Sequence, residues 1–140
     1  MAENKIQQVM LVLERSPETS LVIPLGGDRY RLASTPLGSL SDTGPCWGDI
    51  IEADFHKDGF LYVRRIAERA PLEHREYGLS RQVVESAEFG QLLREIETCG
   101  GGTEIVMGGI FWCHLPVNCS LDVDVRLKSI YEKVHGERNS

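Results

Sequence analysis

Residues 49–68 read DIIEADFHKDGFLYVRRIAE, and this stretch decides the fold. Asp58-Gly59 lies at its centre, between two runs rich in β-branched and aromatic residues. Asp-Gly is a favoured pair for a two-residue hairpin turn, because glycine accepts a positive φ without penalty. A one-residue slip would mix the two faces of the strands, so this turn also predicts a register. The expected cross-strand pairs are Ile51–Ile66, Glu52–Arg65, Asp54–Val63 and Phe55–Tyr62.

The residues before this hairpin predict further strands. Short apolar runs occupy residues 9–13 and 21–23, and residues 28–32 alternate polar and apolar side chains, as a half-buried strand does. Prolines, glycines and polar residues predict loops over residues 16–20, 35–45 and 70–80. The first half therefore predicts a β-meander that leads into the hairpin.

The second half predicts two amphipathic helices. Apolar residues recur at helical spacing in two sets: Phe89, Leu92, Leu93 and Ile96, then Val123, Leu127, Ile130, Tyr131 and Val134. Ser86 is the expected N-cap of the first helix, and Gly100 follows that helix where a C-cap glycine belongs. Aspartates open the second helix and Gly136 ends it.

The apolar residues 103–117 lie between the two helices. They predict either a buried strand pair or one long strand with a kink at Gly108-Gly109. The glycines at 100–102 follow a helix and precede a strand, which is the reverse of a phosphate-binding loop, so we interpret them as a helix terminator. The whole pattern predicts an α+β fold, a mostly antiparallel sheet with both helices packed on one face. We expect a single domain over residues 1–140, with a polar tail after about residue 136.

Composition and charge exclude several classes of protein. The chain has 140 residues, 41% of them hydrophobic and 26% charged, which is ordinary for a globular protein and excludes a disordered or collagen-like chain. Its net charge is −6, from 15 Lys+Arg against 21 Asp+Glu. This balance argues against a nucleic-acid or anionic-membrane binder and permits a basic protein partner.

The sequence also bears on the compartment. No stretch approaches the ~20 apolar residues that span a bilayer. The first residues lack the basic region and apolar core of a signal peptide. We therefore expect a cytoplasmic protein.

The four cysteines predict no metal site. Cys46, Cys99, Cys113 and Cys119 include no CxxC pair. Cys113-His114 with Cys119 brings three possible ligands together, but neighbours on a strand point to opposite faces. We favour free cysteines, and we expect neither a metal nor another cofactor.

Two further clusters could carry chemistry. In Cys46-Trp47-Gly48-Asp49 a thiol nucleophile would need a base, and nothing in the sequence places a histidine beside Cys46. The favoured interpretation is a loop entering a strand, with Trp47 as an anchor. Glu52 and Asp54 share a strand face and could act as paired carboxylates or bind a cation. Arg65, opposite Glu52, favours an ordinary ion pair instead.

The order of these motifs resembles a small bacterial family catalogued as domain of unknown function 4265. The resemblance is carried by residues 28–37 (DRYRLASTPL), 47–53 (WGDIIEA), 58–65 (DGFLYVRR), and 115–124 (LPVNCSLDVD). It covers about residues 5–134, with departures at residues 45–47 and 72–79. It implies a strand, a hairpin and a closing apolar segment. It implies no activity, and the matching Tyr30, Gly48, Asp49, Asp58 and Gly59 are implied to be structural.

We therefore expect a non-catalytic protein-interaction module, specifically an immunity or antitoxin-type protein that binds and blocks a cognate, basic toxin domain. The expected contact residues are exposed acids and one aromatic anchor: Asp42, Trp47, Asp49, Glu52 and Asp54. The alternative is a small enzyme or ligand-binding domain with a pocket near Cys46 and a histidine, either His74 or His114.

Overall fold

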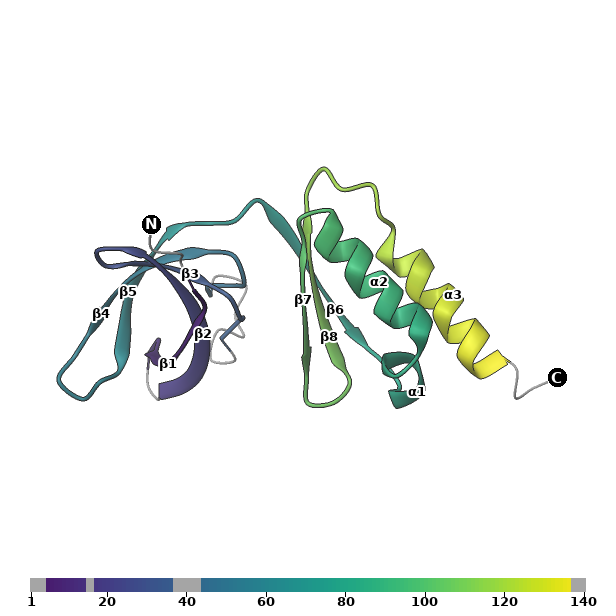
Figure 1. Cartoon of the computed structure of the whole chain (residues 1–140), viewed down its shortest axis with the longest axis horizontal. Coiled ribbons are helices and arrows are strands. Elements are labelled where there is room, and N and C mark those ends of the chain that lie inside the picture. The colour runs from purple at the N-terminus through teal and green to yellow at the C-terminus, as the bar shows by residue number, and fades with distance from the viewer. Residues whose placement is uncertain (1–4, 15–16, 37–43, 137–140) are drawn as a thin grey trace. The chain divides into compact units, whose positions relative to one another are not determined.

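The computed structural model describes residues 5–14, 17–36 and 44–136. Its contacts divide the chain into two compact units, Met1–Ala70 and Pro71–Ser140 (Figure 1). Each unit has its own hydrophobic core. The fold class is α+β, as predicted. The single domain expected over residues 1–140 stays a prediction, and the polar tail after residue 136 lies outside the described residues.

The first unit is a closed five-stranded barrel. Its strands are β1 (Gln7–Val12), β2 (Pro17–Gly26), β3 (Arg29–Leu32), β4 (Ile50–Phe55) and β5 (Leu61–Glu68). Consecutive strands pair antiparallel, which confirms the meander, and β1 closes the barrel by pairing parallel with β5. Apolar side chains fill the barrel: Leu11, Val22, Leu32, Ile51, Ala53 and Leu61.

The loop expected over residues 16–20 is wrong, because β2 begins at Pro17. Pro17 pairs with Val12 as the first residue of its strand, a position where a missing N–H interrupts no ladder. The proline therefore marks where the strand starts.

The hairpin of β4 and β5 confirms half of the predicted register. The pairs Ile51–Ile66 and Glu52–Arg65 form as expected. The other two predicted pairs are wrong, since Asp54 lies opposite Tyr62 and Phe55 opposite Leu61. The ladder shifts by one residue between Glu52 and Ala53, which leaves Arg64 as the extra residue of a β-bulge.

The turn of this hairpin explains the shift. The N–H of Gly59 donates to the carbonyl of His56 at 3.0 Å, and Gly59 has a φ of +83°. The N–H of His56 also donates to the carbonyl of Phe60 at 3.0 Å, so the loop has three residues rather than two. A longer loop moves the pairing beside it by one residue, and the bulge restores the register further along.

The second unit packs helices on one face of a three-stranded antiparallel sheet (Figure 1). Its elements are β6 (Leu72–Gly78), α1 (Arg81–Val84), α2 (Ala87–Thr98), β7 (Gly102–Val106), β8 (Ile110–Pro116) and α3 (Val123–Gly136). The strand order is β6-β8-β7. Phe111, Cys113 and Leu115 of β8 join the core beneath the helices.

Residues 103–117 form the strand pair, the first of the two alternatives, with a turn at residues 107–109. The loop expected over residues 70–80 is wrong, because β6 occupies most of it. β6 lies at the sheet edge and buries none of its residues fully, so its polar sequence carries little apolar signal.

Both predicted helices form. The Ser86 side chain accepts a hydrogen bond from the N–H of Phe89 and caps α2. Gly100 has a φ of +91°, and the N–H of Gly101 donates to the carbonyl of Ile96 at 2.9 Å, a Schellman ending that confirms the terminator. In the apolar stripe of α3, Val123, Leu127 and Ile130 are buried, while Tyr131 is 56% exposed at the edge of the stripe.

Candidate functional site

Asp49 is buried, so the expectation that it lies exposed is wrong. Its side chain is 1% exposed and accepts hydrogen bonds from the N–H of Cys46 at 2.9 Å and of Ala70 at 2.8 Å. Arg69 adds an ion pair at 3.2 Å. The carboxylate therefore joins the loop before β4 to the chain after β5, which is a structural role.

Glu52 and Asp54 lie on the outer face of the barrel and contact arginines. Glu52 accepts a bidentate pair of hydrogen bonds from Arg65, at 2.7 and 3.0 Å. These bonds hold the pKa of the Glu52 carboxyl below its usual range. Asp54 pairs with Arg64 at 2.5 Å, and Arg64 also contacts Asp28. This arrangement confirms the ordinary ion pair predicted for Glu52.

The structure describes one of the other two expected contact residues, Trp47, but not Asp42. Trp47 is half-buried, and its backbone N–H donates to the Thr35 hydroxyl at 3.0 Å. Asp42 lies outside the described residues.

The end of the barrel carries aromatic residues that the list of expected contacts missed. Phe55 is 53% exposed and meets Tyr30 edge to face, with ring centroids 6.4 Å apart. Ile51, Ala53 and Phe55 alternate on the core side of β4, but Phe55 lies past the last fully buried residue. We call Tyr30 and Phe55 the aromatic rim. The sequence contains a sign of this exposure, since the alternation of apolar residues in β4 continues to Phe55, the last residue of the strand. An apolar side chain at the end of a strand lies beyond the core and remains in contact with solvent.

A second aromatic pair lies on the hairpin itself. The rings of His56 and Tyr62 stack with centroids 3.8 Å apart. The Tyr62 hydroxyl donates to Asp58 at 2.6 Å, which raises the pKa of Tyr62 and lowers the pKa of Asp58. The hairpin tip therefore has an ordered polar surface next to the aromatic rim.

The Cys46 thiol and His56, the histidine of the same unit, have contacts that fit structural roles. Cys46 Sγ donates to the carbonyl of Gly44 at 3.7 Å, while His56 stacks on Tyr62. These contacts favour the loop interpretation of residues 46–49.

The sheet of the second unit holds a polar chain of three residues, Glu104, His114 and His74, of which only the central His114 is buried. His114 is 2% exposed, and its Nε2 lies 2.7 Å from a carboxylate oxygen of Glu104. Its Nδ1 lies 2.7 Å from Nδ1 of His74. Cys113 points into the helix-side core instead, which confirms that residues 113 and 114 face opposite sides of the strand. Among the residues that the structure describes, no three His, Cys, Asp or Glu side chains gather as a metal site.

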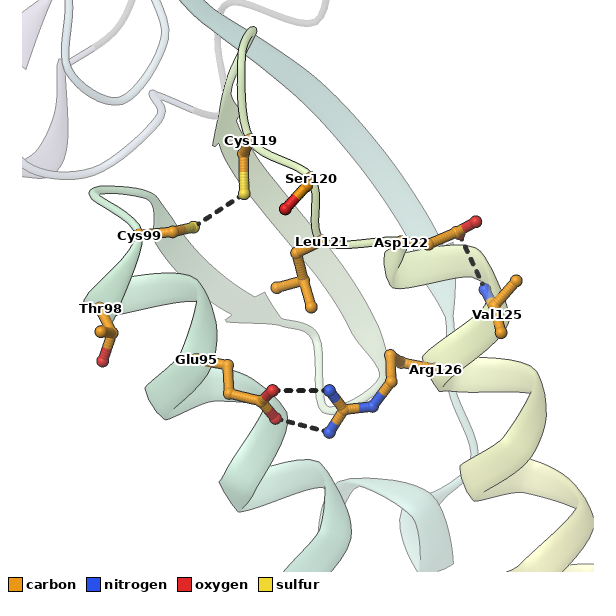
Figure 2. A pocket seen from close by; sticks show the side chains of 9 residues that line it. All are labelled: Glu95, Thr98, Cys99, Cys119, Ser120, Leu121, Asp122, Val125 and Arg126. Atoms are coloured by element: carbon orange, nitrogen blue, oxygen red, sulfur yellow. Dashed lines mark hydrogen bonds and ion pairs between the residues drawn. The ribbon is translucent and has the colours of Figure 1, made fainter.

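A cavity of about 650 Å³ opens in the second unit between the end of α2, the loop after β8 and the start of α3 (Figure 2). Glu95 and Arg126 face each other across it in a bidentate ion pair, with 2.7 and 2.5 Å between the paired atoms. Arg126 holds the pKa of the Glu95 carboxyl below its usual range. At the other end of the cavity Cys99 Sγ and Cys119 Sγ lie 3.1 Å apart. The alternative function predicted a pocket beside Cys46 and a histidine. This cavity is a different one, because neither Cys46 nor any histidine is among the described residues that line it.

No family model and no curated protein matches the chain. A solved structure resembles it: a hypothetical protein from Neisseria gonorrhoeae aligns over 99% of this chain and 91% of its own, at 15% identity and a TM-score of 0.48. A likeness at this level assigns neither a family nor an activity. In the part of the chain that the structure describes, no helix is both long and apolar enough to cross a membrane.

We predict that Cys113 resists alkylation in the folded protein. Its side chain is fully buried, and burial raises the pKa of its thiol to about 12. Folding therefore favours the protonated thiol, and this contribution to stability is present below about pH 9 and lost as the pH rises toward about 12. Iodoacetamide labelling from pH 7 to pH 10, read by mass spectrometry, is expected to modify Cys99 and spare Cys113. Equal labelling of both residues in the folded protein would contradict the prediction, and labelling in urea is the positive control.

Proposed function

We propose that this protein is a non-catalytic protein-interaction module that binds its partner through the aromatic rim of the barrel. The observation that carries the proposal is Phe55, an aromatic side chain more than half exposed on a regular strand. Aromatic residues dominate the energetics of protein interfaces, because they remove a large apolar area from water. Tyr30 holds the Phe55 ring from one side, which lowers the entropy lost on binding.

The charge of the chain supports a basic partner. The first unit has eight Lys+Arg against ten Asp+Glu, a net charge of −2, and the second has seven against eleven, a net charge of −4. A net charge of −6 attracts a positively charged protein and speeds its association. The same sign disfavours nucleic acid and anionic membranes.

The finer form of the proposal is an immunity or antitoxin-type protein that blocks a cognate toxin with a basic domain. A small acidic chain can cap such a domain by filling its cleft with an aromatic anchor and opposing its charge. We further propose membership of the family catalogued as domain of unknown function 4265, on the motifs quoted above, and a cytoplasmic location.

The test is co-expression with the proteins encoded beside this gene, followed by measurement of affinity and of protection from growth arrest. We expect one of these neighbours to bind. Phe55→Ala is expected to weaken that binding about tenfold or more, because it removes the exposed ring of an interface anchor.

Tyr131→Ala is the matched control, since Tyr131 is an aromatic residue of similar exposure, 56%, in the second unit. This control is expected to change the affinity less than twofold. Circular dichroism confirms that both variants fold. Failure of every neighbour to bind, or an equal loss in both variants, would sink the proposal.

A further inference from the structure

The two thiols at the end of the cavity come from segments that are distant in the sequence. Cys99 is the C-cap of α2, and Cys119 lies in the loop between β8 and α3 (Figure 2). Their sulfur atoms are 3.1 Å apart, about 1 Å beyond the ~2.05 Å of a disulfide bond. A small movement of one side chain closes that gap.

The backbone on both sides of the pair is held in place. The N–H groups of Gly100 and Gly101 donate to carbonyls in the last turn of α2, at 3.0 and 2.9 Å. Gly101 lies so close to β8 that an added Cβ would be 2.5 Å from the carbonyl oxygen of His114. The N–H of Cys119 donates to the carbonyl of Pro116 at 2.9 Å, which fixes the loop after β8. Packing of α2 against β8 therefore sets the distance between the sulfur atoms.

The pair is accessible, whereas the third cysteine of this unit is not. Cys99 is exposed and Cys119 is half-buried, but Cys113 is fully buried in the core. A small oxidant can thus reach Cys99 without opening the unit. Partial burial and the neighbouring Cys119 sulfur raise the pKa of Cys99, so the fraction of Cys99 thiolate, and with it the rate of attack, keeps increasing at a pH where a free thiol is already ionised.

We propose that Cys99 and Cys119 are a redox-sensitive dithiol that forms an intramolecular disulfide at one end of the cavity. The oxidant is a low-molecular-weight disulfide such as oxidised glutathione. A cysteine thiolate attacks one sulfur of the oxidant and expels one small thiol, which leaves a mixed disulfide on the protein. The second cysteine then attacks the protein sulfur of that mixed disulfide, forms the Cys99–Cys119 bond and expels the second small thiol. The protein loses two electrons and two protons, and the oxidant becomes two thiols.

The bond would change the unit around the cavity. It closes a loop that contains both β7 and β8 and ties the end of α2 to the segment before α3. Cross-linking of this kind stabilises a fold mainly by restricting the unfolded chain. The cavity wall that carries Glu95 and Arg126 is thereby held in one arrangement in the oxidised protein.

The test is equilibration of the whole chain in buffers of varied reduced-to-oxidised glutathione ratio. We expect a mass decrease equal to two hydrogen atoms and a rise in melting temperature of about 5 °C or more, both reversed by dithiothreitol. Trypsin leaves all three cysteines in one peptide, residues 95–126, because no Lys or Arg lies between them. Cleavage at Glu104, which separates Cys99 from the other two, followed by fragmentation, locates the bond.

Single variants distinguish the proposed bond from other pairings. Cys99→Ser and Cys119→Ser are each expected to abolish the mass decrease and the shift in melting temperature. Cys46→Ser, a matched loss of one thiol in the first unit, is expected to preserve both. A bond to Cys113, a stable glutathione adduct without an internal bond, or no oxidation at any ratio would overturn the proposal. None of these results depends on a binding partner, so they are independent of the proposed function.

Discussion

Asp49→Ala is expected to lower the free energy of unfolding of the first unit by about 3 kcal/mol. The substitution leaves the N–H groups of Cys46 and Ala70 without their acceptor, and it leaves Arg69 without its buried partner. Hydrogen bonds to a charged group contribute more than neutral ones, and a buried donor left unpaired carries the full cost of its desolvation. Urea unfolding in a Trp112→Phe background measures the loss, because Trp47 then reports on the first unit alone.

The matched control is Asp54→Ala in β4, the strand that follows Asp49. Asp54 also pairs with an arginine, but its side chain is 47% exposed, so the loss is expected to stay below about 1 kcal/mol. If the two variants lose equal stability, the buried carboxylate is not what joins the two segments.

Gly101→Ala is expected to destabilise the second unit by about 2–3 kcal/mol. The new Cβ would lie 2.5 Å from the His114 carbonyl oxygen and 2.9 Å from Ile96 Cγ2. One of these neighbours is backbone in the central strand of the sheet, so the turn after α2 or β8 itself has to shift. Urea unfolding in a Trp47→Phe background, which leaves Trp112 as the reporter, measures the effect.

Gly90→Ala in α2 provides a control of opposite sign. Its added Cβ has Arg94 as the nearest neighbour, at 3.8 Å, so the helix gains a better helix former without a clash. We expect a stabilisation of about 0.5–1 kcal/mol. A stabilising Gly101→Ala would show that the close approach of the turn after α2 to β8 is not rigid.

Local patterns predicted the elements better than they predicted their edges. The helix of residues 87–98 follows from the spacing of four apolar residues, with a serine before it and a glycine after it, and both caps form as expected. The strand β6 gave no such signal, because an edge strand buries too little of itself to need alternating apolar residues. The hairpin register failed near its turn, because Asp-Gly does not fix the length of the loop: three loop residues shift the pairing by one, and a bulge at Arg64 restores it.

The expected contact residues show that burial, too, is hard to predict from local sequence. Charge and residue type identified Asp49 and Glu52, but they do not distinguish an exposed acid from one that the fold uses internally. Asp49 is buried by segments that the chain brings together from residues 46 and 70. The Cys99–Cys119 pair is equally invisible in the sequence, since it depends on the packing of a helix end against a distant loop.

The parallel pairing of β1 with β5 follows from the odd number of strands in the barrel. In a meander each strand reverses direction, so the first and fifth strands must run the same way when the ring closes. Leu11 of β1 pairs with Leu61 of β5, fifty positions later in the sequence. We call this pairing of β1 with β5 the seam. Among the strand pairs of the barrel, the seam joins the residues that are farthest apart in the sequence. During synthesis β1 leaves the ribosome well before its second neighbour exists, and its outer edge stays open until β5 arrives. We therefore expect closure of the ring to be the late, slow step in the folding of this unit, and hydrogen exchange at the seam to be the first sign of its opening.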